Sequence, residues 1–503
     1  MGRTKFKRRG SQGLWIVMIG VAMATGGCAQ FSADGGMLLL QDIASNELQK
    51  DIVKIENQDD AAHVRDRVNS LLSGTLSVDE AVQIALLNNR ALQAAFNELG
   101  VSEAQMIEAS LPPSPTFSLA RLSAGGLVLE IERNVLQNIL GLVTLPRRRE
   151  IAEDQFHQAQ LRATNEILKT AAETRRNYYR AVAAGQTVIL LKRARVAAES
   201  LSDLAKKLGE TGSLGRINQA RQHEFYAQVS QQLAIAILRH RSERDRLARL
   251  MGLWGDDINF RLPDALKPLP PRPMRRDDIE AQAISSRVDL QLARLQLETL
   301  AKSFGLTHAT RFINVLEVRG MSNTEWERVV ETDYELVGGN LRRTDTTVTE
   351  KLPWRGFEVE FQVPIYDFGE ARTRSAAQSY RQAVNLLADK AINVRGEARE
   401  AYQAYRGTYD IAKLYDGKLV PLRNIISEEM LLQYNGMLAD LFELLVDARS
   451  RNQTSIASIE SQRDFWLATV DLQVAVVGGG GMGGSMGETG GQMAAADGGG
   501  AGH

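Results

Sequence analysis

The chain has 503 residues, a formal net charge of −1 and an aromatic content of 6%. Its 60 basic and 61 acidic residues nearly balance, which gives no reason to expect nucleic acid as a partner. Long stretches are dominated by Ala, Leu, Gln, Glu and Arg, a composition typical of extended helices.

The N-terminus is typical of a signal peptide over residues 1–27, with a basic start followed by the apolar stretch 14–24. That stretch is too short for a membrane span, which needs about 20 apolar residues. Cys28 follows Thr25-Gly-Gly and is the only cysteine of the chain, so it forms no internal disulfide. These four residues resemble a bacterial lipoprotein processing site, which implies a covalent lipid on Cys28. The alternative is an ordinary signal cleaved nearby.

The first half of the chain predicts helices around a strand pair. Residues 28–75 are polar and poorly periodic, and we interpret them as a tether. Ser77 and Glu80 then form a capping-box pattern for a helix that extends to about residue 110. Strands are expected at 116–122 and 127–135, with a turn between them. A helix from about 147 to 208, a break at 209–215 and a returning helix to about 252 follow.

The second half repeats this order after a Pro-rich linker at 256–275. We expect a helix at 277–304, strands at 312–318 and 357–365 and a loop at 323–354. A helix from 370 to 433, a turn at 434–436 and a helix from 438 to 474 come last. The pattern predicts a two-fold internal repeat, 76–255 and 276–476, followed by a disordered Gly- and Met-rich tail at 477–503.

The strand expected at 357–365 alternates between apolar and polar residues. Phe357, Val359 and Phe361 alternate with Glu358 and Glu360, which indicates a sheet with one apolar and one acidic face. The earlier strand has the same alternation, with Leu127, Leu129 and Ile131 apolar and Glu130 and Glu132 acidic. A soluble sheet fits this pattern, and so does a membrane barrel with lipid outside and water inside. Four strands cannot close a barrel, so a membrane location requires several copies of the chain.

Three stretches together resemble the TolC family of outer-membrane efflux proteins. They are residues 76–89 (LSVDEAVQIALLNN), 363–369 (VPIYDFG), and 434–436 (YNG) running into 442–448 (FELLVDA). The resemblance covers roughly residues 70–475. It implies a mainly α fold with a small β part, made of long α-helical hairpins and four transmembrane β-strands per chain. Three chains would share one twelve-stranded β-barrel, continued by an α-helical tunnel.

The same resemblance implies a function and partners. The homotrimer would lie in the bacterial outer membrane, in contact with its lipid, and extend into the periplasm. It would be a passive exit duct for an inner-membrane transporter, joined to it through a periplasmic adaptor protein.

The resemblance also assigns roles to residues. Glu130, Glu132, Glu358 and Glu360 would line the pore, and a merely solvated polar face is the alternative. Asp440, Glu443 and Asp447 would form a periplasmic gate, with surface charge between packed helices as the alternative. The adaptor-contacting tips would comprise Gly212, Leu214, Gly215, Tyr434, Gly436 and Leu438.

Two other classes of protein fit less well. A lipid-anchored periplasmic coiled-coil adaptor or scaffold would usually have one hairpin between small β-domains, whereas this chain predicts two hairpins, each after a strand pair. An enzyme is not expected, because the six His residues are scattered and no HExxH, paired Cys/His, G-x-S-x-G or Walker pattern occurs. We therefore expect no catalytic residues, no metal site and no cofactor besides the lipid on Cys28.

Overall fold

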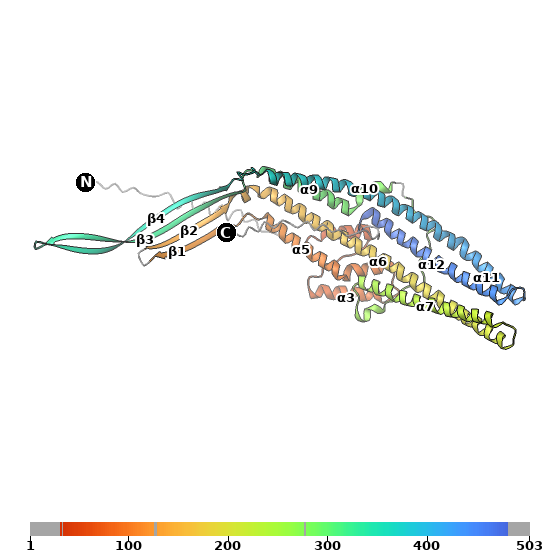
Figure 1. Cartoon of the computed structure of the whole chain (residues 1–503). Coiled ribbons are helices and arrows are strands. Elements are labelled where there is room, and N and C mark those ends of the chain that lie inside the picture. The colour runs from red at the N-terminus through yellow and green to blue at the C-terminus, as the bar shows by residue number, and fades with distance from the viewer. Residues whose placement is uncertain (1–30, 33, 125–127, 276–277, 481–503) are drawn as a thin grey trace. The chain divides into compact units, whose positions relative to one another are not determined.

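The computed structural model describes residues 31–32, 34–124, 128–275 and 278–480 (Figure 1). The predicted signal peptide, Cys28 and residues 481–503 of the predicted tail lie outside them. The chain divides into two compact units. The sheet unit comprises the described parts of Met1–Asp42, Ala94–Ala163 and Leu292–Ala388, and the helical unit those of Ile43–Gln93, Thr164–Gln291 and Asp389–His503.

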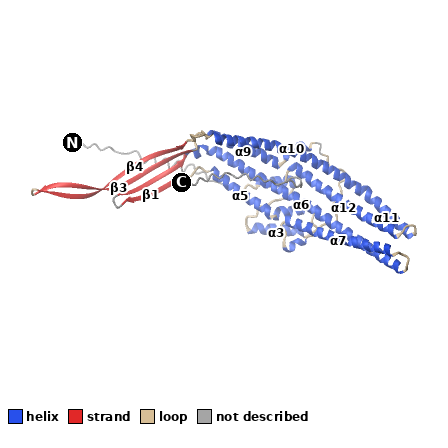
Figure 2. Ribbon diagram, viewed as in Figure 1, coloured by secondary structure: helices blue, strands red, loops and turns tan. Residues whose placement is uncertain are grey.

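In the described residues, all strands lie in one antiparallel sheet of order β1-β2-β3-β4 (Figure 2). The strands are β1 (Thr116–Ala124), β2 (Val128–Asn138), β3 (Val315–Val337) and β4 (Asn340–Gln362). The expected pairing of the first two strands is confirmed. The central pairing joins β2 to β3, so strands from the two halves of the chain form one sheet.

The loop expected at 323–354 was wrong, because β3 and β4 pair without interruption from Val315–Gln362 to Val337–Asn340. Gly338 and Gly339 have φ of 67° and 87°, the backbone that a two-residue hairpin turn requires. Many Thr and Val residues favour strands here, although the frequent charges gave the segment the composition of a loop. Beyond residue 327, β3 has no β2 partner and forms a two-stranded ribbon with β4 (Figure 1).

The helix expected to start at Ser77 is two helices, α4 (Val78–Asn88) and α5 (Arg90–Ser110). The Ser77–Glu80 capping box is confirmed. Asn89 is extended between the helices, with ψ of 118°, and its Oδ1 accepts hydrogen bonds from the amides of Ala91 and Leu92. Asn89 therefore ends one helix and caps the next. In the second half, Arg287 is likewise extended, with ψ of 119°, and separates α8 (Ile279–Ser286) from α9 (Val288–Ala309).

The first long hairpin consists of α6 (Ile139–Glu210) and α7 (Arg216–Leu250). Helix α6 begins eight residues before the expected start near Arg147. Asn138 Oδ1 accepts a hydrogen bond from the Gly141 amide at 2.6 Å and caps the helix. Pro146 lies inside the helix rather than before it, where its missing N–H removes a single hydrogen bond from the early turns.

The second hairpin consists of α10 (Glu370–Leu414), α11 (Val420–Asn435) and α12 (Leu441–Val477). The single helix expected from 370 to 433 was wrong, because a π-helical segment, η3 (Tyr415–Leu419), separates α10 from α11. Pro421 follows this segment and has no N–H for the carbonyl four residues earlier, a common cause of such an irregularity.

The segment before α4 contains helices that its weak periodicity did not predict. These are α2 (Leu38–Ile43), the π-helical η1 (Ala44–Leu48) and α3 (Gln58–Leu72). In the helical unit, the Gln83 side chain donates to the Asp51 carbonyl and the Gln93 side chain to the Val53 carbonyl, both at 2.8 Å. Two buried glutamines thus hold an extended strip of backbone against the helices.

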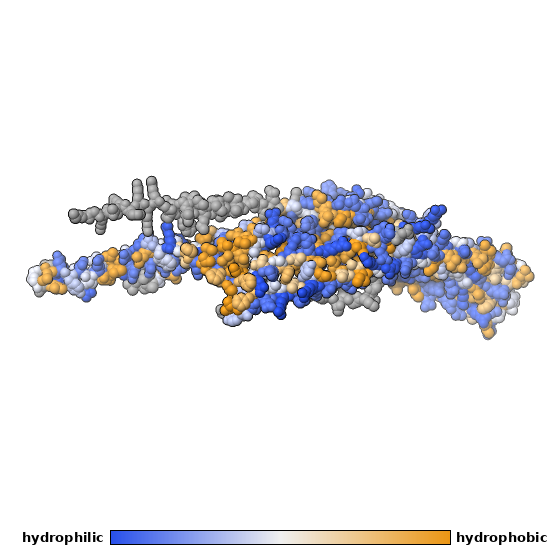
Figure 3. All heavy atoms as spheres, turned by 90° about the horizontal axis from the view of Figure 1, so that it is seen from above, coloured by the Kyte–Doolittle hydropathy of each residue, from blue (hydrophilic) through white to orange (hydrophobic). Residues whose placement is uncertain are grey.

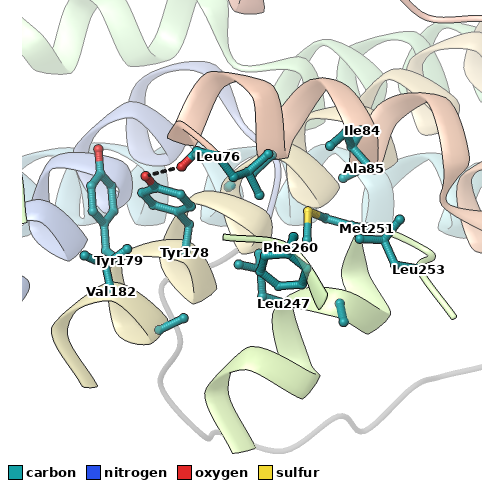
Figure 4. Close-up of a cluster of buried hydrophobic side chains, with 14 of the residues drawn as sticks. Leu76, Ile84, Ala85, Tyr178, Tyr179, Val182, Leu247, Met251, Leu253 and Phe260 are labelled. Atoms are coloured by element: carbon teal, nitrogen blue, oxygen red, sulfur yellow. Dashed lines mark hydrogen bonds between the residues drawn. The ribbon is translucent and has the colours of Figure 1, made fainter. Parts of the chain in front are cut away.

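The core of the helical unit gathers apolar side chains from α3, α4, α6, α7 and α12. The Tyr178 hydroxyl donates to the Leu76 carbonyl at 2.9 Å, which satisfies both polar groups inside this core (Figure 4). Met251 and Leu247 are fully buried beside them. The short 3-10 helix η2 (Gly255–Asn259) then leads into the Pro-rich segment. Among the described helices, none has both the length and the apolar run needed to cross a membrane.

Candidate functional site

The strand register sorts the side chains of the sheet onto two faces. Glu358 pairs with Arg319, Glu360 with Glu317 and Glu130 with Glu325, and paired residues of antiparallel strands share a face. By the two-residue period of a strand, Glu132 shares this face too. The four glutamates predicted from the sequence therefore lie on one face. We name this surface the acidic face, defined by Glu130, Glu132, Glu317, Glu325, Glu327, Glu350, Glu358 and Glu360.

Four of these eight glutamates were not among the candidates. Glu325, Glu327 and Glu350 were assigned to a loop, and Glu317 was placed in a strand but not considered. Acidic residues stand at positions 325, 327, 331, 333 and 335 of β3, and this period of two could have identified Glu325 and Glu327.

Three pairs of glutamates lie directly opposite each other: Glu130–Glu325, Glu317–Glu360 and Glu327–Glu350. Like charges opposite each other destabilise a sheet. On this face of the paired segments 116–138, 315–327 and 350–362, Arg319 is the one cation among the described side chains, and its Nη1 lies 3.3 Å from Glu358 Oε2. Stability does not account for so uneven a distribution of charge.

The opposite face of the sheet carries exposed apolar side chains near the helices. Phe357 is 79% exposed and Leu119 75%. Figure 3 shows apolar residues gathered over the end of the sheet that leads into the helices. Soluble monomers rarely expose so large an apolar patch. Among the described residues it includes the exposed Phe117, Leu119, Phe357, Val359 and Phe361 and the half-buried Leu129, Ile131, Leu316 and Val318. The predicted Leu127 lies outside the described residues.

Gly369 makes the transition from β4 to α10. Its φ is +72°, and a Cβ there would lie 2.3 Å from the Arg311 carbonyl oxygen. Asp367 caps the helix, because its carboxylate accepts hydrogen bonds from the amides of Gly369 at 3.0 Å and Ala371 at 3.2 Å. These bonds hold the pKa of Asp367 below its ordinary value. The strand can turn into the helix here only because residue 369 has no side chain.

The predicted tips are the turns of the two hairpins. In the first, Gly212 has φ of +74° with open space around it, and the Leu214 amide donates to the Leu208 carbonyl. In the second, the Leu438 amide donates to the Gln433 carbonyl, and Met437 is 93% exposed. Gly215 is the N-cap of α7 and Gly436 the C-cap of α11, whereas Tyr434 still belongs to α11.

The three predicted gate residues have different surroundings. Asp440 is the N-cap of α12, and Glu443 completes its capping box; both are exposed. Asp447 is buried, and its Oδ1 lies 2.9 Å from Arg423 Nη2. Each therefore has a structural role in the single chain, and the gate itself stays a prediction. The two hairpins also touch near their tips, where Gln222 Nε2 donates to the Leu441 carbonyl at 3.2 Å.

In the described part of the chain, no group of three or more His, Cys, Asp or Glu residues is arranged to hold a metal ion.

Comparisons with known proteins find solved structures with a similar fold. No protein-family model matches the sequence, and no curated protein does either. Among solved structures, the Campylobacter jejuni CmeC outer membrane channel matches with a TM-score of 0.64 and 16% identity over 88% of this chain and 93% of that one. The outer-membrane channel OprN matches with a TM-score of 0.64 and 14% identity over 87% and 96%. CusC, whose structures concern transmembrane channel formation, matches with a TM-score of 0.63 and 15% identity over 80% and 92%. The chain therefore has the fold of the TolC-like outer-membrane channels, as the resemblance in its sequence predicts.

Proposed function

We propose that three copies of this chain form an outer-membrane channel, the passive exit duct of a tripartite efflux or secretion system. The observation that carries the proposal is the division of the sheet into an acidic face and an exposed apolar face. A barrel wall in a membrane has this organisation, because one side meets lipid and the other side meets water. Glu130, Glu132, Glu358 and Glu360 then line the pore, together with the glutamates of β3.

Strand lengths support the membrane location. A tilted strand crosses the hydrocarbon core with about 9–11 residues, and β1 has 9 residues and β2 has 11. In the described sheet, β1 and β4 each leave one edge unpaired. Such edges are not tolerated in lipid, so β4 of one copy pairs with β1 of the next until the barrel closes. A trimer closes it with twelve strands.

The exposed hairpin tips support the proposal that the channel binds partner proteins in the periplasm. Met437 is 93% exposed, Leu438 82% and Ile217 72%, and exposed apolar tips are suited to a protein interface. We assign these tips, with Gly212, Leu214, Gly215, Tyr434 and Gly436, to a periplasmic adaptor that joins the channel to an inner-membrane transporter. Asp440, Glu443 and Asp447 lie close behind the second tip, where a periplasmic gate would be. A lipid on Cys28 would add a second membrane anchor.

Single-channel recording in a planar bilayer tests the proposal. The purified protein should form ion-conducting pores that prefer cations, because a ring of carboxylates attracts them. The variant E130Q/E132Q/E358Q/E360Q should conduct with weaker cation preference, and adding E317Q/E325Q should weaken it further. The control E98Q/E199Q/E224Q/E298Q removes four exposed glutamates outside the sheet and should retain the preference.

Two outcomes contradict parts of the proposal. Unchanged selectivity in the six-site variant would remove the role of the acidic face while leaving the channel. If the protein formed no pores and no detergent-stable trimer, and left membrane fractions after delipidation, the lipid-anchored adaptor or scaffold would be the better assignment.

A further inference from the structure

The apolar face of the sheet also carries a group of basic side chains. Arg121 lies on β1, Arg133 on β2, Arg328 on β3, and Lys351 and Arg355 on β4, and all five are exposed. We name these five residues the basic belt. The sequence alone does not reveal it, because its members come from four strands and three of them lie in or beside the segment expected to be a loop.

Register and contacts place the belt on the face opposite the glutamates. Arg121 pairs with Ile131, which pairs with Thr324, and Arg133 Nη1 donates to Thr324 Oγ1 at 3.4 Å. Lys351 pairs with Trp326, and its Nζ lies 5.6 Å from the centre of the indole ring. Arg355 and Arg328 are an even number of residues from Lys351 and Trp326, so they share this face.

Charge is divided almost completely between the two faces in this part of the sheet, with Arg319, paired with Glu358, as the exception. The described side chains of segments 116–138, 315–328 and 349–362 include no acidic residue on the face of the belt, whereas all eight glutamates lie on the other face. Cations grouped without acidic partners repel one another. A belt of this kind therefore indicates an anion that the described part of the chain does not supply.

The position of the belt identifies the anion. On β4 the apolar residues Phe361, Val359 and Phe357 come nearest the helices, and Arg355 and Lys351 follow them. Phe361 and Lys351 are ten residues apart, about 34 Å along the strand and about 24 Å across a membrane at a tilt of about 45°. The apolar band of a membrane barrel is about 25 Å tall. On the same scale Arg355 lies about 14 Å across the membrane from Phe361, so the belt occupies the outer part of that band. Lys351, at its far side, lies beside a tryptophan, which favours the interface with lipid headgroups.

We propose that the basic belt binds the phosphorylated headgroups of lipids in the outer leaflet. The guanidinium group of an arginine forms paired, charge-assisted hydrogen bonds with two phosphate oxygens. The neighbouring apolar side chains accommodate the first part of the acyl chains. The proposal rests on the membrane location of the sheet in the proposed function.

Thermal dissociation of the purified trimer in an uncharged detergent tests the belt. The protein is mixed with bisphosphorylated lipid A, with the same lipid after removal of its phosphates, or with inorganic phosphate at the same phosphate concentration. The phosphorylated lipid should raise the dissociation temperature, because a ligand of the native state stabilises it. The other two additions should not. In the variant R121Q/R133Q/R355Q this rise should be lost.

The control R216Q/R241Q/R249Q removes three exposed arginines of α7 and should retain the full rise. Circular dichroism and trimer content, measured without lipid, show whether each variant is folded. If the triple variant does not fold, the single variants R121Q, R133Q and R355Q are tested in its place, and each should reduce the rise in dissociation temperature. A full rise in the triple variant, or in all three single variants, overturns the proposal. So does an equal effect of dephosphorylated lipid, while an equal effect of inorganic phosphate replaces it with a site for free anions.

Bilayer recordings separate this proposal from the proposed function. A belt variant that forms pores like the wild type but has lost the lipid effect supports both. If the wild type forms no pores, the proposal that the protein is a channel is rejected. The effect of phosphorylated lipid on the dissociation temperature then tests the lipid-binding proposal by itself.

Discussion

Arg423 on α11 and Asp447 on α12 form a buried ion pair across the second hairpin, with Arg423 Nη2 2.9 Å from Asp447 Oδ1 and 3.2 Å from the Asp447 carbonyl oxygen. The two side chains are 19% and 7% exposed. Removing one member leaves the other as an uncompensated buried charge, whereas replacing both with apolar residues removes both desolvation costs. The pair therefore links α11 to α12 near the tip of the hairpin.

We expect R423M to lower the local free energy of opening of the hairpin by about 3 kcal/mol, the cost of breaking a buried pair. Hydrogen exchange of α11 and α12, followed by mass spectrometry, measures this. The double variant R423M/D447L should recover most of the protection. Equal loss in the single and double variants would mean that packing, and not charge, holds the hairpin.

Two substitutions of Asp440 distinguish its role as a helix cap from its predicted role in a gate. D440A removes the side-chain acceptor at the start of α12 and should destabilise the helix end by about 1 kcal/mol, seen as faster exchange of the first-turn amides. D440N should preserve the cap, because asparagine caps as well as aspartate, but it removes the charge. If Asp440 is part of a gate, D440N should change single-channel conductance without changing exchange. Identical conductance in D440N and the wild type would restrict Asp440 to its capping role.

G369A should destabilise the protein and lower the yield of folded trimer. An alanine there has positive φ, a strain of about 1–3 kcal/mol, and its Cβ would lie 2.3 Å from a backbone oxygen. Gly407 lies in the same helix, α10, with no atom near its Cβ position. G407A should be neutral or stabilise by up to about 1 kcal/mol. Thermal unfolding followed by circular dichroism compares the two, and equal melting temperatures would contradict the assigned role of Gly369.

Asp289 in the helical unit should make stability depend on pH. Burial alone would raise its pKa, but the hydrogen bonds and charge of Arg287 and the charge of Lys390 outweigh burial, so the pKa lies below its ordinary value. A lowered carboxylate pKa contributes stability that is present above the unfolded pKa of about 3.9 and is lost as the pH falls through the lower, folded pKa.

We therefore expect D289N to lower the melting temperature at pH 7 and to lower it progressively less as the pH falls below about 4. Arg287 also pairs with Glu397, so E397Q, which removes this ion pair, should also lower the melting temperature at pH 7. A difference between D289N and the wild type that stayed constant over this range would show that Asp289 does not titrate in this way.

Local signals in the sequence predicted much of the secondary structure and failed at identifiable places. The Ser77–Glu80 capping box and the β1–β2 hairpin depend on residues close in the chain, and both were correct. Asn89 divided a predicted helix because its side chain can cap the next helix while its backbone is extended. The β3–β4 ribbon was missed because charged residues alternate with Thr and Val there, a composition that strands and loops share.

The same holds for the candidate site, where local signals in the sequence predicted some features and only the tertiary structure revealed the others. Alternation within β4 alone predicted that Glu358 and Glu360 lie opposite Phe357 and Phe361, since successive side chains of a strand point to opposite faces. The sequence alone does not reveal that β2 pairs with β3, because that pairing joins residues almost two hundred positions apart and depends on tertiary register. The register of the strands places Glu130 opposite Glu325 and brings five cationic side chains from four strands together on the other face. The sequence by itself thus determined the period of each strand, and only the tertiary structure decided which strands combine into one acidic and one basic and apolar surface.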